Sequence, residues 1–386
     1  MKFSCTTVEF LQAIQLVSRA ISGQQALPIL GNILFKAEGN MCTVSATDLE
    51  LSIITHFPAN IESEGSITIP AKAILNFAQY NNDSEIILES SEGTQLKCTS
   101  AHSKTALSGE KASDYPSIPS VEKKTEFKLD AASLLEALNL VTFASARTSL
   151  RPVLSGVYLR AENKKLIFVA TDSYRLSEYS IPTDIDGEIS CIIPVKVLEE
   201  LKTMIAAKKP AKRSPTEESE KQGTREEAMP ITITLSAQQL EVVIENTRLV
   251  SRLIEGKFPD YRQIIPKEAT TKALLSTRDL TTTVKRMHYF AKEVNNNLTF
   301  TLAGTNAHIA TPQTQLGRDE TTIPTEIQGQ EGKIALSSSY LLDFFAHISS
   351  EQVELQITDS MHPAVFHVPG NENFLHLIMP LRLQES

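Results

Sequence analysis

The sequence predicts an α+β protein built from three copies of one structural unit. Two observations support this: short motifs recur at a fixed spacing, and each copy combines helices with several short strands. Self-similarity at a fixed period is typical of repeat architectures. Strands that return antiparallel through short turns, with the helices kept apart from them, indicate the α+β class rather than alternating βαβ units.

Motifs in the first part of the chain recur 124 residues later. The matching segments are 27–30 with 151–154, 46–48 with 170–172, and 69–72 with 193–196. Asp114-Tyr115 matches Asp260-Tyr261 instead, at a spacing of 146. About 22 residues are therefore inserted into the second copy, and residues 207–229 are the candidate, being rich in charge and almost free of apolar residues. Such a composition predicts a disordered loop.

A capped helix opens each copy. Thr6 and Glu9 form a capping box, in which we expect the hydroxyl and the carboxylate to satisfy backbone N–H groups reciprocally. Asp130 and Ser276 hold the same position in the second and third copies. The predicted helices cover residues 8–21 and 71–80, 130–141, 280–292 and 338–348, and a further one follows residues 193–196.

Short β-branched runs with alternating apolar residues predict the strands. Turns such as Glu38-Gly39-Asn40 and Glu92-Gly93 connect them. The predicted strands are 42–46, 66–70, 85–90, 165–170, 231–235, 240–245 and 353–358, with two more at 297–304 and 308–313.

The composition is that of an ordinary globular protein, with 41% apolar and 22% charged residues in a chain of 386. There is no apolar run of transmembrane length and no signal peptide at the N-terminus, so we expect a cytoplasmic protein. The cysteines are Cys5, Cys42, Cys98 and Cys191, which form no CxxC pair. Buried thiols are therefore expected, and neither a metal nor a cofactor.

Nucleotide-binding, zinc-protease and nucleophile-elbow motifs are absent from the sequence. His362, His367 and His376 are predicted to be structural residues of C-terminal strands. Asp48 and Asp172 occupy equivalent positions in two copies, so we interpret them as strand-end Asx turns rather than a catalytic pair. The sequence therefore gives no support for an active site.

The net charge of −9 argues against simple high-affinity binding to nucleic acid. The exposed faces of the predicted helices are nevertheless neutral to basic, whereas acidic residues gather in loops and strand edges. Two interpretations stay open: ordinary solvated faces, or a helix-lined surface for DNA phosphates. The cations concerned are Arg19, Lys72, Arg147, Arg151, Lys196, Lys285 and Arg286.

Several segments together resemble one family. LPILGNILF, ATDLELS, ATDSYRLS, EGKFPDYRQIIP and LIMPLRL stand in the order found in the bacterial DNA sliding clamps, the beta subunits of replicative DNA polymerase III. The resemblance covers the chain except the insertion and the last three residues. It implies three processivity-fold domains, at 1–121, 125–267 and 270–386, with helices inside and sheets outside.

The resemblance also implies a function. Two chains would join head to tail, first domain to third, in a ring around duplex DNA. Such a clamp has no catalysis of its own, holds DNA by topology, and tethers the replicative polymerase and other clamp-binding proteins. An ATP-dependent loader would open it. A net charge of −9 is compatible with this, because encirclement replaces affinity.

In this family, partner peptides bind an apolar pocket between the second and third domains, with a polar rim. The matching positions are Thr171, Ser173, Tyr174, Arg175, Leu176, Pro259, Gln263, Ile264, Ser337, Tyr340, Met361, Pro363, Met379, Pro380, Leu381 and Arg382. We expect Ser173 to Leu176 to form a surface site just past a strand, and Met361 and Pro363 to lie in a late strand.

Some positions depart from the family pattern. Tyr174 stands where the family often has histidine, and Gln263 where it often has arginine. Gln384-Glu385-Ser386 extends the usual end of the chain, and Gln24 replaces a cation of the first-domain DNA loop.

The resemblance places the dimer interface on a first-domain edge strand and on the third domain. Its residues are His102, Lys104, Leu107, Tyr289, Phe290, Asp319 and Glu320. Thr105 stands where the family can use an aromatic residue. Two alternatives to a clamp are an enzyme acting on nucleic acid and a scaffold that binds only proteins. The missing catalytic motifs disfavour the enzyme. The basic faces of the helices disfavour the scaffold.

Overall fold

The computed structural model describes residues 1–23, 27–91, 94–148, 150–185, 188–208 and 229–383. The chain divides into two compact units, Met1–Ala132 with Thr203–Leu253, and Ser133–Lys202 with Ile254–Ser386. Gln24, the Glu92-Gly93 turn, nearly all of the predicted insertion and the tail Gln384–Ser386 lie outside the described residues.

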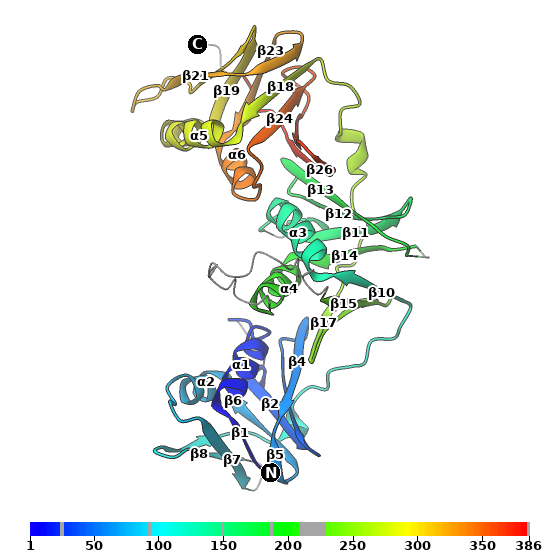
Figure 1. Cartoon of the computed structure of the whole chain (residues 1–386), viewed down its shortest axis with the longest axis vertical. Coiled ribbons are helices and arrows are strands. Elements are labelled where there is room, and N and C mark those ends of the chain that lie inside the picture. Colours follow the sequence, from blue (N-terminus) through cyan, green and yellow to red (C-terminus); the bar gives the residue numbers. More distant parts are fainter. Residues whose placement is uncertain (24–26, 92–93, 149, 186–187, 209–228, 384–386) are drawn as a thin grey trace, which may run out of the picture. The chain divides into compact units, whose positions relative to one another are not determined.

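Two antiparallel sheets form the first unit (Figure 1). The five-stranded sheet has the order β5 (Asn60–Ser63), β1 (Lys2–Thr6), β7 (Glu85–Ser91), β8 (Gln95–Thr99) and β9 (Lys104–Ser108). The eight-stranded sheet has the order β10 (Thr125–Asp130), β15 (Pro230–Leu235), β16 (Gln239–Ile244), β17 (Thr247–Arg252), β4 (Leu51–Pro58), β3 (Met41–Thr47), β2 (Asn32–Glu38) and β6 (Gly65–Pro70).

The second unit also contains two antiparallel sheets. The nine-stranded sheet has the order β14 (Ser190–Pro194), β11 (Gly156–Glu162), β12 (Lys165–Thr171), β13 (Arg175–Pro182), β26 (Asn371–Ile378), β25 (Ala364–Val368), β24 (Gln352–Ile357), β18 (Thr271–Ser276) and β22 (Glu326–Gly329). The four-stranded sheet has the order β21 (Glu320–Pro324), β20 (Asn306–Ala310), β19 (Asn297–Ala303) and β23 (Gly332–Ser337).

The threefold repeat of the sequence reappears in this topology. The strand series β6-β2-β3-β4 of the first copy corresponds to β14-β11-β12-β13 and to β23-β19-β20-β21. Neighbouring copies share a sheet, because β4 pairs with β17 and β13 pairs with β26. The short motifs predicted the copies, but they did not predict that each sheet crosses from one copy into the next.

Two helices accompany each copy. They are α1 (Thr7–Ser18) and α2 (Ala71–Gln79), α3 (Ala131–Val141) and α4 (Val195–Lys208), and α5 (Thr277–Ala291) and α6 (Ser338–Phe345). The predicted ends of α1 and α6 were about three residues too late. At Thr6 the capping box is only half formed: its Oγ1 accepts a hydrogen bond from the N–H of Glu9 but donates its own proton to the Glu9 carboxylate. The prediction of a reciprocal hydrogen bond from the Glu9 carboxylate to the backbone was therefore wrong.

The amphipathic pattern of α1 gives the first unit its core. Phe10, Ile14 and Val17 are buried on one face, and Gln12 and Gln15 are exposed on the other. Burying a side chain of this size stabilises the fold by about 2 to 3 kcal/mol. The four cysteines are buried or partly buried, and burial raises the pKa of the Cys5, Cys98 and Cys191 thiols to about 12.

Candidate functional site

The first copy contains a sharp turn between β3 and β4. Oδ1 of Asp48 accepts hydrogen bonds from the backbone N–H of Glu50 (3.1 Å) and of Leu51 (2.8 Å). The hydroxyl of Thr47 accepts from the N–H of Leu49 and donates to the carbonyl of Leu51. Leu49 has a φ of 76°, which is rare for a residue with a side chain.

The second copy repeats this turn between β12 and β13. Oδ1 of Asp172 accepts from the N–H of Tyr174 (2.9 Å) and of Arg175 (3.0 Å). Thr171 uses its hydroxyl as Thr47 does, and Ser173 has a φ of 78°. The prediction that both aspartates form strand-end Asx turns is confirmed.

The two turns differ in the residue that follows them. Leu51 is buried in the first copy, and Arg175 takes its place in the second with a side chain only 4% exposed. Leu176 is also buried, so the prediction of a surface site was wrong for these two residues. They open strand β13 and point into the fold. Ser173 and Tyr174 are exposed, and Tyr174, at 62% exposed, is the large side chain that the turn presents to solvent.

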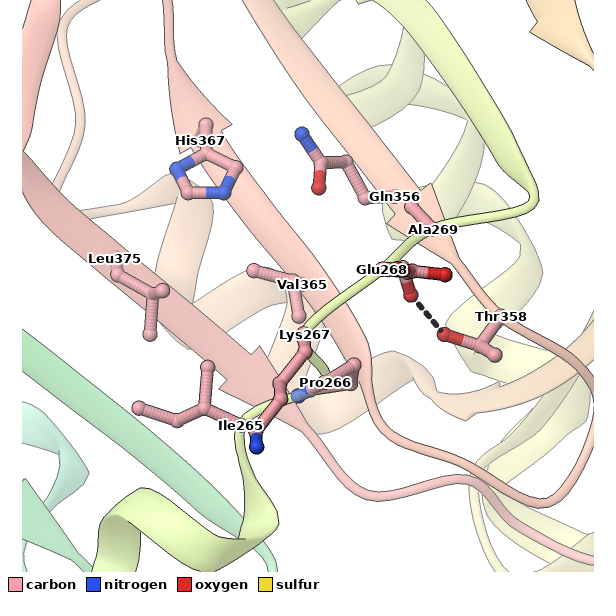
Figure 2. Close-up of a pocket in the computed structure, with 10 residues that line it drawn as sticks. All are labelled: Ile265, Pro266, Lys267, Glu268, Ala269, Gln356, Thr358, Val365, His367 and Leu375. Atoms are coloured by element: carbon pink, nitrogen blue, oxygen red, sulfur yellow. Dashed lines mark hydrogen bonds between the residues drawn. The ribbon is translucent and has the colours of Figure 1, made fainter.

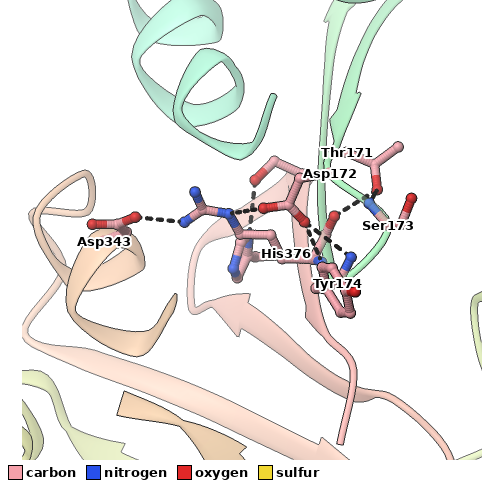
Figure 3. A network of polar contacts seen from close by, with 8 residues as sticks. Thr171, Asp172, Ser173, Tyr174, Asp343 and His376 are labelled. Carbon is pink, nitrogen blue, oxygen red and sulfur yellow. Dashed lines mark hydrogen bonds and ion pairs between the residues drawn. The ribbon is translucent and has the colours of Figure 1, made fainter. Parts of the chain in front are cut away.

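The buried guanidinium of Arg175 bridges the carboxylates of Asp172 and Asp343, which Figure 3 labels. Its Nε lies 3.1 Å from Oδ2 of Asp172, and its Nη1 lies 2.8 Å from Oδ2 of Asp343 on α6. The same group lies 4.8 Å from the ring centroid of Tyr340 and 5.5 Å from that of Phe143. Two acids and two aromatic faces thus compensate for burial of the charge.

His376 lies beside this network and is fully buried. Its Nδ1 is 2.7 Å from the hydroxyl of Ser177, and its ring stacks on Phe344 at 4.6 Å. Burial, and secondarily the charge of Arg175, hold the pKa of His376 well below its usual range. Nε2 has no hydrogen-bond partner among the described residues. A neutral imidazole is the form that this environment stabilises.

His376 and His367 lie in strands as predicted, but His362 lies in a turn, where it pairs with Asp359. Burial lowers the pKa of His367, which lies in β25. Within the described ranges, no group of three or more His, Cys, Asp or Glu residues could hold a metal ion.

A groove of about 590 Å³ opens over the network. Of the predicted pocket residues it brings together Ser173, Tyr174, Arg175 and Tyr340. The rings of Tyr174 and Tyr340 stack with centroids 6.4 Å apart. The other lining residues are Ser145, Ala146, Arg147, Thr148, Leu150, Arg151, Leu154, Asp172, Ser339 and Asp343.

Two of these lining residues had been predicted to face DNA. Arg147 and Arg151 are exposed, and both lie at the groove with Leu150, whose side chain is 95% exposed. The groove therefore presents two cations beside an aromatic pair. Leu154 is a lining residue that was not predicted from the sequence, although the repeat singles it out by its match to Leu30. No sequence signal links Asp343 or Phe143 to Arg175.

An apolar cluster continues from Leu154 beneath the groove. It includes Leu176, Phe258 and Leu377, against which Met379 packs half-buried. The N–H of Met379 donates to the carbonyl of Tyr174 at 2.8 Å. The predicted pocket residues Leu176 and Met379 therefore belong to this floor rather than to the lining of the groove itself.

The FPDYRQI segment lies at the same cluster. Phe258 and Tyr261 are buried, and the hydroxyl of Tyr261 donates to the carboxylate of Glu178 on β13. Burial and this bond raise the pKa of Tyr261. The groove lining does not include Pro259, Gln263 or Ile264, which lie close to Phe258 and Tyr261 in the chain. Gln263 donates to Asp260, and Ile264 is 40% exposed.

The remaining pocket candidates come from the third copy. Met361 and Pro363 precede β25 in an irregular segment, so their placement in a strand was wrong; Met361 is 80% exposed. Ser337 is the buried N-cap of α6. After β26, Pro380 is half-buried, Leu381 donates to the carbonyl of Ala335, and the carbonyl of Arg382 accepts from Asn297. Thr171 is part of the turn described above.

A second cavity, of about 270 Å³, lies between the segment 265–269 and strands β24 to β26 (Figure 2). Val365 and Leu375 form its apolar side, with His367 and Gln356 nearby. Thr358 closes one end by donating to the carbonyl of Glu268 at 2.8 Å.

The predicted dimer residues gather at two sheet edges. In the first unit, β9 is an edge strand of the five-stranded sheet and contains Lys104 and Leu107. His102 precedes this strand and pairs with Asp83. In the second unit, β21 is an edge strand that begins at Glu320.

Beside β21, Tyr289 and Phe290 lie at the end of α5, with their rings edge to face at 5.4 Å. Asp319 accepts two hydrogen bonds from the guanidinium of Arg286. Arg286 is thereby tied to the dimer candidates, although it had been predicted to face DNA.

The other predicted DNA-facing cations lie on exposed helix positions. Lys72 is on α2, Lys196 on α4 and Lys285 on α5, and Arg19 follows α1 as its C-cap. No helix in the described ranges has the length and apolar character needed to cross a membrane.

Family models of the DNA polymerase III beta subunit match the chain in order along its length: the N-terminal domain at residues 1–119, the central domain at 128–214 and the C-terminal domain at 262–382. The chain belongs to the DNA polymerase III beta subunit family. Beta subunits of this family are sliding clamps, non-catalytic processivity factors that work as dimers with DNA and a polymerase. The predicted family, fold class and function are confirmed.

Relatives named beta sliding clamp match end to end. That of Synechocystis sp. is 29% identical and that of Chlamydia pneumoniae 27%, each covering 99% or more of this chain and 100% of the relative. The solved sliding clamp of Bartonella birtlesii, bound to griselimycin, is 25% identical with a TM-score of 0.90, covering 99% of this chain and 100% of that one. The clamp from Bacillus subtilis shows the same fold at 23% identity, with a TM-score of 0.90 and full coverage of both chains.

Proposed function

We propose that two copies of this chain close head to tail into a ring around duplex DNA, with β9 of each copy joining β21 of the other. The repeated topology supports this proposal most directly. Strand β4 pairs with β17 at the first junction of the repeat, and β13 pairs with β26 at the second. By correspondence, β21 is the counterpart of β4 and β13, and β9 is the counterpart of β17 and β26.

In the described chain, β9 and β21 each have a neighbour on one side only. An exposed sheet edge offers unpaired N–H and C=O groups to another strand. Lys104 on β9 and Glu320 on β21 carry opposite charges, which would favour the β9–β21 pairing over two like edges. Tyr289 and Phe290, beside β21, supply an apolar centre, and Leu107 supplies one on β9.

Duplex DNA would be held by topology, with Arg19, Lys72, Lys196 and Lys285 near its phosphates. These cations are few, so contact with DNA is weak and independent of sequence, and the ring can slide. The net charge of −9 fits a protein whose hold on DNA does not come from affinity. A closed ring requires an ATP-dependent loader to open it, in the cytoplasm where replication takes place.

The groove at Tyr174 and Tyr340 would take short peptides of the polymerase and of other clamp-binding proteins. The exposed ring of Tyr174, the half-buried ring of Tyr340 and the apolar floor near Met379 suit leucine and aromatic side chains. Arg147 and Arg151 would meet acidic or carbonyl groups of the same peptide. A groove of about 590 Å³ implies a small interface and therefore an exchangeable one.

A closed ring should stay on DNA that has no free end and leave DNA that has one, and this difference tests the proposal. The protein is loaded onto nicked circular DNA with a clamp loader and ATP, separated by gel filtration, and the DNA is then cut once. Release after cutting, with retention on uncut circles in high salt, is the expected result. Protein that stays on linear DNA would contradict a topological hold.

A further inference from the structure

We propose that Arg175 is a positioning residue: its role is to hold the two walls of the groove together rather than to bind the peptide. This inference rests on the proposed binding of partner peptides at the groove. One wall is the turn Thr171–Arg175 of the second copy, which carries Tyr174. The other is helix α6 of the third copy, which carries Tyr340.

Each carboxylate that binds Arg175 belongs to a different wall. Asp172 shapes the turn through Oδ1 and holds the Nε of Arg175 through Oδ2. Asp343 stands on α6, one turn after Tyr340, and binds Nη1. The guanidinium also lies over the Tyr340 ring at 4.8 Å. One planar cation therefore fixes the turn, the helix and the aromatic ring of the helix at once.

Arg175 lines the groove, but its burial leaves a ligand little of its side chain to touch. Its side chain is 4% exposed, compared with 62% for Tyr174. The turn itself does not require an arginine, because the first copy has Leu51 at this position and keeps the same pattern of hydrogen bonds. The role of Arg175 is therefore to join the walls, and its loss would leave two carboxylates facing each other.

Peptide affinity tests this role. A fluorescein-labelled peptide with leucine and phenylalanine anchors is titrated with the full chain, and anisotropy gives the Kd. We expect Arg175→Met and Asp343→Asn each to weaken binding about tenfold, and the double variant to be no weaker than Arg175→Met alone, because the two residues act as one pair. Arg248→Met, which removes the pair with Glu241 outside the groove, should leave the Kd unchanged.

A spectroscopic measurement separates positioning from general destabilisation. The chain has no tryptophan, so Tyr340→Trp introduces a single reporter over the guanidinium. In that background, Arg175→Met should change the emission of the folded, peptide-free protein, and Arg175→Lys should restore part of both emission and affinity. If Arg175→Met does not fold, Asp343→Asn provides the same two measurements.

Two results would overturn the inference: an unchanged emission and Kd in Arg175→Met, or losses that simply add in the double variant. A wild-type chain that binds no peptide, whatever the emission of the reporter, would instead refute the proposed function of the groove.

Discussion

Nη1 of Arg175 donates a hydrogen bond of 2.8 Å to Oδ2 of Asp343, which joins strand β13 of the second copy to helix α6 of the third. The two residues are 168 positions apart in the chain. The guanidinium lies 4.8 Å from the ring centroid of Tyr340, and Arg175 directly follows Tyr174 in the turn. The first copy has Leu51 at the position of Arg175, so the repeat pattern does not require this buried pair. The pair occurs at the junction of the second and third copies, beside the groove.

The two Asx turns allow a matched comparison. Asp48→Ala removes hydrogen bonds to two backbone N–H groups and should lower the free energy of unfolding by about 1 to 2 kcal/mol. Asp172→Ala also removes one partner of a buried cation, and the cost should rise to about 3 to 5 kcal/mol. Urea unfolding at one protein concentration gives both values. Equal losses would show that the ion pair to Arg175 contributes nothing.

Leu49 offers a stabilising substitution. Its φ of 76° costs a residue with a side chain about 1 to 2 kcal/mol, and glycine avoids this cost. Leu49→Gly should therefore raise the free energy of unfolding by about 0.5 to 1 kcal/mol, after the greater chain entropy of unfolded glycine is subtracted. Leu49→Ala keeps the strain and serves as the control; if it stabilises the protein as much as glycine does, the backbone explanation fails.

Stability should fall in mild acid because of His376. Its pKa in the folded protein lies well below the 6.5 of the unfolded chain, owing mainly to burial. Below pH 6.5 the unfolded chain thus binds a proton that the folded chain does not, so the free energy of unfolding decreases as pH falls. The slope approaches about 1.4 kcal/mol per pH unit and vanishes above pH 6.5.

Urea unfolding between pH 5 and 8 measures this slope in the wild type and in His376→Phe. The phenylalanine should remove most of it, while the smaller contributions of His288 and His367, whose pKa values are also lowered by burial, remain. An identical slope in both proteins would place the acid sensitivity elsewhere.

The β9–β21 junction predicts a monomerising substitution. Leu107 is half-buried on the inner face of β9. Pairing of β9 with β21 would remove water from an aspartate placed there, which costs free energy. Leu107→Asp should therefore yield monomer in sedimentation velocity at micromolar concentration. Ala106→Asp, on the opposite face of the same strand, is the control and should stay dimeric. A dimeric Leu107→Asp would rule out this edge as the interface.

Partner binding should depend on the exposed aromatic ring and on the apolar floor together. Tyr174→Ala combined with Met379→Ala should abolish binding of a clamp-binding peptide and leave the dimer intact. Each side chain is partly exposed, so the folded state should lose little. Calorimetry with the peptide and sedimentation of the same sample give the two readouts. Wild-type affinity in the double variant would refute the assignment of the groove.

Much of the fold was predictable because it repeats. The spacing of 124 related the helices of the first two copies, and the recurrence of Thr-Asp at 47–48 and 171–172 identified the two Asx turns. Local hydrogen bonds determine both features, so local sequence is enough to predict them. The exposed faces of α1 and α2 also followed from periodicity alone.

Spatial relations between distant segments were not predictable in this way. Arg175 looks like a surface cation in the sequence, and only the tertiary structure buries it beside Asp343 and the rings of Phe143 and Tyr340. Arg286 was predicted to face DNA, and no sequence signal indicated that it also pairs with Asp319. Met361 had been placed in a strand and lies in an irregular segment.

By itself, the sequence determined the family, the three copies and the local turns, because these depend on residue order and on hydrogen bonds between neighbours. Only the tertiary structure decided which copies share a sheet and which strand edges stay unpaired. It also decided that Arg175 is buried between the carboxylates of Asp172 and Asp343. Those outcomes depend on burial and on charge pairing between residues more than a hundred positions apart, which no local pattern encodes.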